Sequence, residues 1–131
     1  MVLDGCSEDH IIERNKFYRC SSGGMHIGPG GMRTIQRVYV LNNIFLAVEG
    51  YGVKMHNADT TKNCLFKGNS FQDRAGGTAM TQAILCAGAG VHAIVDNFFA
   101  CTNKISASST DLCSGNRTSS AGNSPTYISE T

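Results

Sequence analysis

The sequence has no tryptophan, only two prolines and few charged residues, which make up 16% of the chain. It contains no long run of like charge, and the formal net charge at pH 7 is +1. Surfaces that bind nucleic acid or anionic membranes normally need a concentrated positive field, so the composition argues against both kinds of partner. Fifteen glycines and an apolar content of 41% indicate a folded domain with many turns and a lightly charged surface.

Long apolar segments are also missing. The first ten residues carry three acidic side chains and no apolar stretch, so they do not resemble a secretory signal peptide. The longest weakly polar run, Tyr39–Val48, is about half the length that a membrane-spanning helix needs. We therefore expect a soluble protein without a signal peptide or a transmembrane segment.

The cysteines are spaced too widely for a zinc module or a dense disulfide scaffold, because no C-x-x-C pair occurs. Reduced cysteine packs like a small apolar residue. We therefore predict that most cysteines lie reduced in the core, with disulfides as the alternative. The six residues are Cys6, Cys20, Cys64, Cys86, Cys101 and Cys113.

One short unit occurs four times, and its fixed point is an asparagine that is followed two residues later by a phenylalanine. An apolar residue also stands three positions before each asparagine, and successive asparagines are 28, 26 and 28 residues apart. The repeated residues are Asn15, Asn43, Asn69, Asn97, Phe17, Phe45, Phe71 and Phe99. This periodicity predicts repeated structural units that stack on one another. A weaker fifth copy runs from Cys113 to Asn116 and lacks the phenylalanine.

The apolar residues within each unit form short runs that are typical of β-strands, separated by glycine-rich or polar segments. The apolar residue before each asparagine and the phenylalanine after it are five positions apart, so they would face opposite sides of an uninterrupted strand. Both are apolar in every copy, which predicts a bend at the asparagine. We expect this asparagine to adopt the left-handed conformation, with the stacked amides forming a hydrogen-bonded ladder beside stacked phenylalanine rings.

A short right-handed, single-stranded parallel β-helix of about four to five coils accounts for these features. An antiparallel sandwich or barrel also uses short strands and glycine turns, but it does not require the same corner every 26 to 28 residues. We assign residues 1–105 to the coils. Residues 106–131 are rich in serine and threonine, so we expect an irregular last turn and an extended C-terminal tail, either disordered or docked on a partner.

Three copies of the unit place asparagine, glycine or aspartate directly before the repeated asparagine, in the segments 42–45, 68–71 and 96–99. These corners resemble the pectate-lyase-like superfamily of right-handed parallel β-helices, and the resemblance runs from about Val2 to Asn116. It implies the architecture but not an activity, because the superfamily contains polysaccharide lyases, hydrolases, phage tailspikes and noncatalytic virion proteins.

The acidic residues are dispersed, and no position of the repeat carries a column of them. The lyases of the superfamily are expected to use such a column to bind calcium. The closest candidate for a catalytic pair is Asp73 with Arg74, and solvated turn residues explain it better. Glu8 and Asp9 are neighbours whose side chains would face opposite sides of a strand, so they make a poor glycosidase pair. The sequence thus predicts no catalytic residue and favours a protein that is not an enzyme.

Histidines and glycine-rich segments add no further predicted site. His10 and His92 occupy equivalent positions three coils apart, which is too far for one metal ion. His26 and His56 lie near strands of adjacent units without a matching set of ligands. Residues 88–93 fit the dinucleotide pattern G-x-G-x-x-A, but a strand pattern follows them where a helix is required. We therefore predict no metal site and no cofactor.

A short stack of strands leaves unpaired edges at both ends, and we expect other chains to cover them, most simply in a homotrimer. The leading hypothesis is a noncatalytic structural or assembly protein of a phage or similar virion, such as a decoration, spike or fibre component. Under this hypothesis the protein is located in the virion, and its partners are other virion proteins and a surface glycan. The alternative is a carbohydrate-active enzyme or glycan-binding module of the tailspike or polysaccharide-lyase type, and a bacterial β-helix protein without a viral link is a third.

Overall fold

Short strands make up the computed structural model, which describes residues 1–3, 7–28, 35–56, 61–86, 91–107 and 111–118. No helix occurs in these ranges. Every strand pairing within them is parallel. The prediction of an all-β chain built from parallel strands is confirmed.

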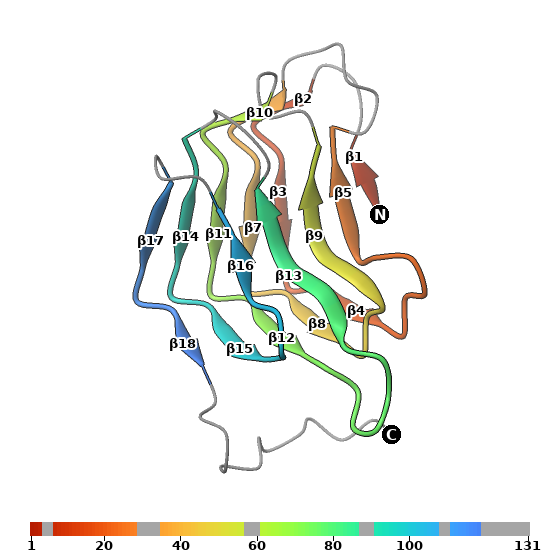
Figure 1. The fold of residues 1–131 in the computed structure, drawn as a ribbon. Helices are drawn as coiled ribbons and strands as arrows, with labels where there is room; N and C mark the ends of the chain where they lie inside the picture. Colours follow the sequence, from red (N-terminus) through yellow and green to blue (C-terminus); the bar gives the residue numbers. More distant parts are fainter. Residues whose placement is uncertain (4–6, 29–34, 57–60, 87–90, 108–110, 119–131) are drawn as a thin grey trace.

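The strands form four sheets, which we name A to D (Figure 1). Sheet A contains, in spatial order, β1 (Val2–Leu3), β5 (Met25–Ile27), β9 (Gly50–Met55), β13 (Met80–Cys86) and β16 (Ile105–Ser106). Sheet B contains β2 (Ser7–Glu8), β6 (Ile35–Gln36) and β10 (Thr61–Lys62). Sheet C contains β3 (Ile11–Glu13), β7 (Tyr39–Leu41), β11 (Leu65–Lys67), β14 (Ala93–Val95) and β17 (Leu112–Ser114). Sheet D contains β4 (Lys16–Tyr18), β8 (Ile44–Leu46), β12 (Ser70–Gln72), β15 (Phe98–Ala100) and β18 (Arg117–Thr118).

The order of strands along the chain explains how the sheets are built. We call one run of the chain through sheets A, B, C and D a pass. Each of the first three passes contributes one strand to each sheet in this order, and the next pass lies beside it. Figure 1 shows the strands of sheet C side by side in the order β3, β7, β11, β14 and β17. Because the passes pair in register, residues at one position of the repeat form a column across the sheet, as Phe45, Phe71 and Phe99 do.

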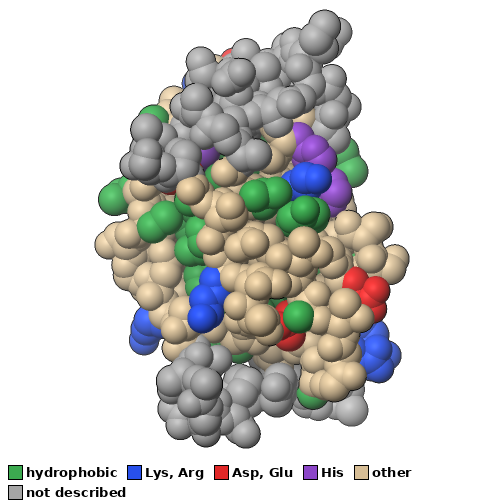
Figure 2. Space-filling view, in the orientation of Figure 1, with side chains coloured by type: hydrophobic (Ala, Val, Ile, Leu, Met, Phe, Trp, Pro, Cys, Tyr) green, Lys and Arg blue, Asp and Glu red, His purple; other side chains and the backbone are tan. Residues whose placement is uncertain are grey.

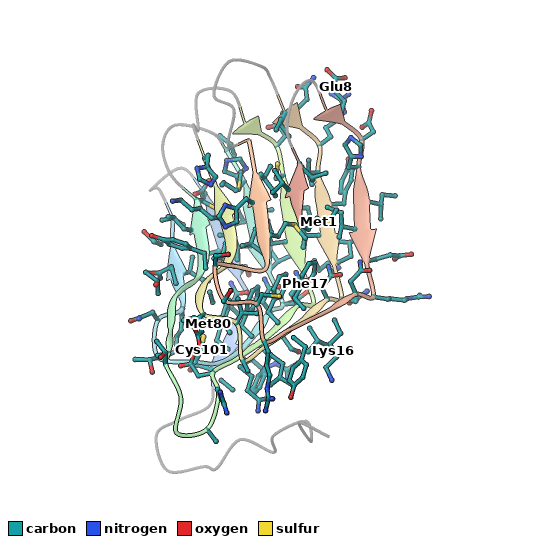
Figure 3. All side chains as sticks on the ribbon, turned by 90° about the vertical axis from the view of Figure 1, so that its right-hand side faces the viewer. Met1, Glu8, Lys16, Phe17, Met80 and Cys101 are labelled. Atoms are coloured by element: carbon teal, nitrogen blue, oxygen red, sulfur yellow. The ribbon has the colours of Figure 1, made fainter. Side chains whose placement is uncertain are left out.

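The core is lined by middle residues of the strands in sheets C and D and by inward-facing residues of sheet A, such as Met25 and Val53. The rings of Phe17, Phe45, Phe71 and Phe99 stack with successive centroid distances of 4.6, 4.7 and 5.2 Å. Figure 3 shows Phe17 directed into the molecule and its neighbour Lys16 directed away from it. Full burial of a phenylalanine side chain stabilises a fold by about 1.5–3 kcal/mol, so this stack is a major part of the core.

Two glycines let sheet A approach the phenylalanine stack. A β-carbon on Gly52 would lie 2.5 Å from the carbonyl oxygen of Ala83 and 2.8 Å from the ring of Phe71. A β-carbon on Gly24, one pass earlier, would lie 2.8 Å from the ring of Phe45. The backbone of sheet A therefore packs directly against the rings, at positions where no side chain fits.

The bend before sheet D is made by the residue that precedes each repeated asparagine. The left-handed residues are Arg14, Asn42, Gly68, Asp96 and Gly115, with φ between 54° and 67°. The prediction that the repeated asparagine itself is left-handed is wrong. The preceding residue makes the turn, and the asparagine side chain then points inward and is buried in the middle passes. This explains the asparagine, glycine and aspartate found before it, since these residues tolerate the left-handed region.

The parallel sheets continue beyond the segment 1–105 that was assigned to the coils. Strands β17 and β18 extend sheets C and D as far as Thr118. Asn116 takes the repeated asparagine position, and Thr118 pairs with Phe99 where the earlier passes have a phenylalanine. The rest of the predicted tail, 119–131, lies outside the described residues.

Candidate functional site

The four predicted ladder asparagines lie in one column, and the fifth copy extends it. The backbone N–H of each donates to the side-chain oxygen of the asparagine in the next pass, at 2.9 Å for Asn15, Asn43 and Asn69 and 3.0 Å for Asn97. The last acceptor is Asn116. Each Nδ2 group also donates along the column, at 3.0 to 3.2 Å.

Each later asparagine also binds back to the previous pass. Nδ2 of Asn69 donates to the carbonyl oxygen of Val40 at 2.8 Å, and Nδ2 of Asn43 donates to that of Ile12 at 2.8 Å. Asn43 and Asn69 are fully buried, and their amide groups are hydrogen-bonded within the fold. These residues join successive passes, so the column holds the scaffold together, and the amides of Asn43 and Asn69 are used inside the fold.

A second column of caps lies at the corner before sheet C. The backbone N–H of Cys64 donates to Nδ1 of His92 at 3.3 Å, and the N–H of His92 donates to Oδ1 of Asp111 at 2.9 Å. Burial lowers the pKa of His92, and the charge of Asp111 opposes this shift. The sequence shows that His10 and His92 are equivalent, but it does not reveal this column, because other passes supply different residue types, such as Cys64 and Asp111, at the same position.

Three of the five described cysteines behave as core residues, and Cys20 is partly buried. Cys64, Cys86 and Cys101 are buried, and none of the described cysteines is in a disulfide. Burial raises the pKa of Cys64 to about 11 and that of Cys101 to about 12, so both thiols are protonated at neutral pH. The exposed member is Cys113, and Cys6 lies outside the described residues.

The acidic candidates from the sequence are engaged in structural contacts. Glu8, at the end of the molecule labelled in Figure 3, and Asp9 both bind Arg37, at 2.7 and 2.6 Å. Hydrogen bonds from Gln36 and Arg37 lower the pKa of Glu8, and the hydrogen bond from Arg37 lowers that of Asp9. Asp73 accepts from the backbone N–H groups of Met80 and Thr102, both at 2.8 Å. These contacts fit roles in turns and at a strand corner.

The outer face of sheet C carries an unbroken column of apolar and aromatic side chains, which we call the outer column. Its members pair in register across all five strands and are Ile11, Tyr39, Leu65, Ala93 and Leu112. The two end members are the most exposed, Ile11 at 65% and Leu112 at 59%. The face is hollowed beside Leu65, Ala93 and Leu112 by a shallow cavity of about 360 Å³.

Two histidines meet on the outer face of sheet A. Nε2 of His56 lies 3.2 Å from Nδ1 of His26, and both side chains are half-buried. The prediction that adjacent passes carry them was sound, but their contact was missed. His26 pairs with Lys54, and His56 follows two residues later on the same side of the strand, so the register would have revealed the pair. Among the described residues, no three histidine, cysteine or acidic side chains converge as a metal site.

The dinucleotide pattern lacks its structural context. Residues 87–90 lie outside the described part of the chain, and Ala93 begins strand β14 where a helix would be needed. The described residues also contain no helix that is long and apolar enough to cross a membrane. The chain matches no protein-family model, no curated protein and no solved structure.

Proposed function

We propose that the chain is a noncatalytic structural module of a larger assembly, folded as a short right-handed parallel β-helix of the pectate-lyase-like kind. The pass order A, B, C, D supports this architecture, as do the parallel pairing and the asparagine ladder. In its most specific form, the proposal is a decoration, spike or fibre component of a phage or similar virion that self-associates as a homotrimer.

The outer column is the observation that carries this proposal. Side chains along the strands of sheet C point alternately into the core and outward. If the outward face met only solvent, polar side chains would be expected on it. The column instead presents apolar or aromatic groups in every pass, from Ile11 to Leu112. Contiguous apolar surface of this kind marks protein contact sites.

The cavity beside the outer column strengthens the case for a protein partner. Leu65, Ala93 and Leu112 border it, and Val91 lies at its edge with 55% of its surface exposed. The small side chain of Ala93 between two leucines leaves room for an apolar group from outside. Apolar side chains that fill such hollows contribute most of the binding energy at many interfaces.

The strands at the two ends of the stack offer a second contact surface. Sheet C ends at β3 and β17, and sheet D ends at β4 and β18. End strands present backbone groups on their outer edge, and such edges pair readily with further strands. Both features fit a module that works by contact with other copies or other components of an assembly.

Light scattering after size-exclusion chromatography tests the self-association. We expect the chain at micromolar concentration to have three times the monomer mass, and we expect Leu65→Glu to be monomeric. Lys67→Glu is the matched control, because Lys67 lies two residues further on the same strand and face and is exposed. A monomeric wild-type chain would overturn the assembly proposal, and a Leu65→Glu trimer would exclude the outer column as its interface.

The noncatalytic assignment needs a separate test. Incubation of the chain with a panel of bacterial surface polysaccharides should release no oligosaccharide, as judged by mass spectrometry. Release of defined fragments would instead establish a carbohydrate-active enzyme. Proteomic analysis of purified virions from the source of the sequence should detect the chain if it is a virion component, and its absence from them would overturn that part of the proposal.

A further inference from the structure

The histidine pair on sheet A is a cluster that the proposed scaffold does not use. His26 is the middle residue of β5, with buried Met25 and Ile27 on either side, so its ring faces outward. His56 directly follows β9. Their rings are 5.2 Å apart between centroids and inclined by 36°, which brings one nitrogen of each ring to 3.2 Å. Figure 2 shows histidine side chains gathered at the surface in this region, beside a basic side chain.

The surroundings hold His26 in place. A β-carbon on Gly23 would lie 2.6 Å from Nε2 of His26, so the ring fits only because residue 23 is glycine. The ring therefore lies between Gly23 on one side and His56 on the other, with Nδ1 directed at His56. The nearest strand neighbour, Lys54, has its ammonium group 4.7 Å from the centre of the Tyr51 ring, and this contact draws it towards the ring.

The pair has the spacing that a shared metal ion requires. Zinc binds imidazole nitrogens at about 2.0–2.1 Å, so two nitrogens on one tetrahedral ion are roughly 3.4 Å apart. The observed separation of 3.2 Å is close to that value. Imidazole binds zinc, copper and nickel in its neutral form. Burial, the charge of Lys54 and that of His26 lower the pKa of His56, which favours the neutral form at pH 7.

We propose that His26 and His56 together bind one divalent transition-metal ion, with zinc, nickel and copper as the candidates. Nδ1 of His26 and Nε2 of His56 are the protein ligands, and water or ligands from a partner complete the coordination. The ion takes the place of the proton between the rings, and the ring that donated it changes tautomer, so this proton moves to the other nitrogen of the same ring and both imidazoles stay neutral. The site lies on sheet A and is independent of the outer column on sheet C.

Titration calorimetry with zinc on the full, reduced chain tests the site. We expect His26→Gln and His56→Gln each to weaken zinc binding roughly tenfold or more. His10→Gln is the matched control, because His10 is exposed and lies outside the pair, and it should bind zinc as the wild type does. Equal affinity in all three variants would place the ion on other groups, such as the exposed thiol of Cys113, and would overturn the proposal.

A second test uses nuclear magnetic resonance of the histidine rings in the wild-type chain, so its result does not depend on whether the variants fold. Substoichiometric nickel should broaden the ring signals of His26 and His56 before those of His10 and His92, and magnesium should not. The zinc affinity should also fall between pH 7.5 and 5.5, because protons compete for the same nitrogens. Broadening that begins at His10, or affinity that is independent of pH, would contradict a site made of the two imidazoles.

Discussion

The two corners that flank sheet C perform the same task with different residues. At the corner after sheet C, every pass supplies an asparagine, and each backbone N–H is capped by the next asparagine side chain. At the corner before it, Cys64 and His92 donate their N–H groups to His92 and Asp111. At both corners the chain bends at a residue in the left-handed conformation. Asn42 makes the bend directly before Asn43, and Asn63 makes it directly before Cys64. The corner geometry thus demands an acceptor from the next pass, but not a particular one.

Of the two corners, the asparagine corner should lose more stability when a residue at its centre is replaced. Replacement Asn69→Ala removes the acceptor for the N–H of Asn43 and the donor to Val40, both inside the core. Buried groups that lose their partners are costly, so we expect a loss of about 3 kcal/mol in the free energy of unfolding. Urea denaturation followed by circular dichroism measures it.

The matched control for this variant is Asn15→Ala at the exposed end of the same column. Asn15 donates to Asn43 but lies at the surface, where water replaces lost partners. We expect a loss below about 1 kcal/mol. Equal losses in the two variants would show that the ladder contributes no more in the core than at its end.

The corner before sheet C should instead make the free energy of unfolding depend on pH. Burial lowers the pKa of His92 in the folded chain below its ordinary value of 6.5. The unfolded chain therefore takes up this proton first as pH falls. The stabilisation is complete above pH 6.5 and is lost as pH decreases towards the folded pKa. We expect a loss of about 1 kcal/mol between pH 7.5 and 5.5 from this residue.

Two variants in this column, one buried and one exposed, isolate the contribution of His92. His92→Asn keeps a side-chain acceptor for Cys64 but cannot titrate, so its urea midpoint should change less between pH 7.5 and 5.5 than that of the wild type. His10→Asn, at the exposed start of the same column, should keep the wild-type pH dependence. A pH dependence that is unchanged in His92→Asn would assign the effect to other groups, such as His56.

The same comparison explains what the sequence could and could not predict. The asparagine and phenylalanine columns repeat one residue type at a fixed spacing, so the all-β parallel architecture was accessible from the sequence. The caps at the corner before sheet C could not be predicted because successive passes place different residue types there, although His92 and Asp111 each accept a backbone hydrogen bond in the same way. The contact of His26 with His56 required the register of β5 and β9, which spacing alone does not fix.

Substitutions at the left-handed residues should change stability least. They also compare the two corners at the same backbone position. Arg14 has φ of 57° at the asparagine corner, and Asn63 has φ of 52° at the other. A left-handed conformation costs an ordinary residue about 1–2 kcal/mol, whereas asparagine tolerates it. Glycine adopts it freely but loses more entropy on folding. We therefore expect Arg14→Gly to raise the free energy of unfolding by about 0.5 kcal/mol, and Asn63→Gly to give no gain. Urea midpoints decide the sign, and a loss of stability in Arg14→Gly would mean that its side chain contributes more than its backbone conformation costs.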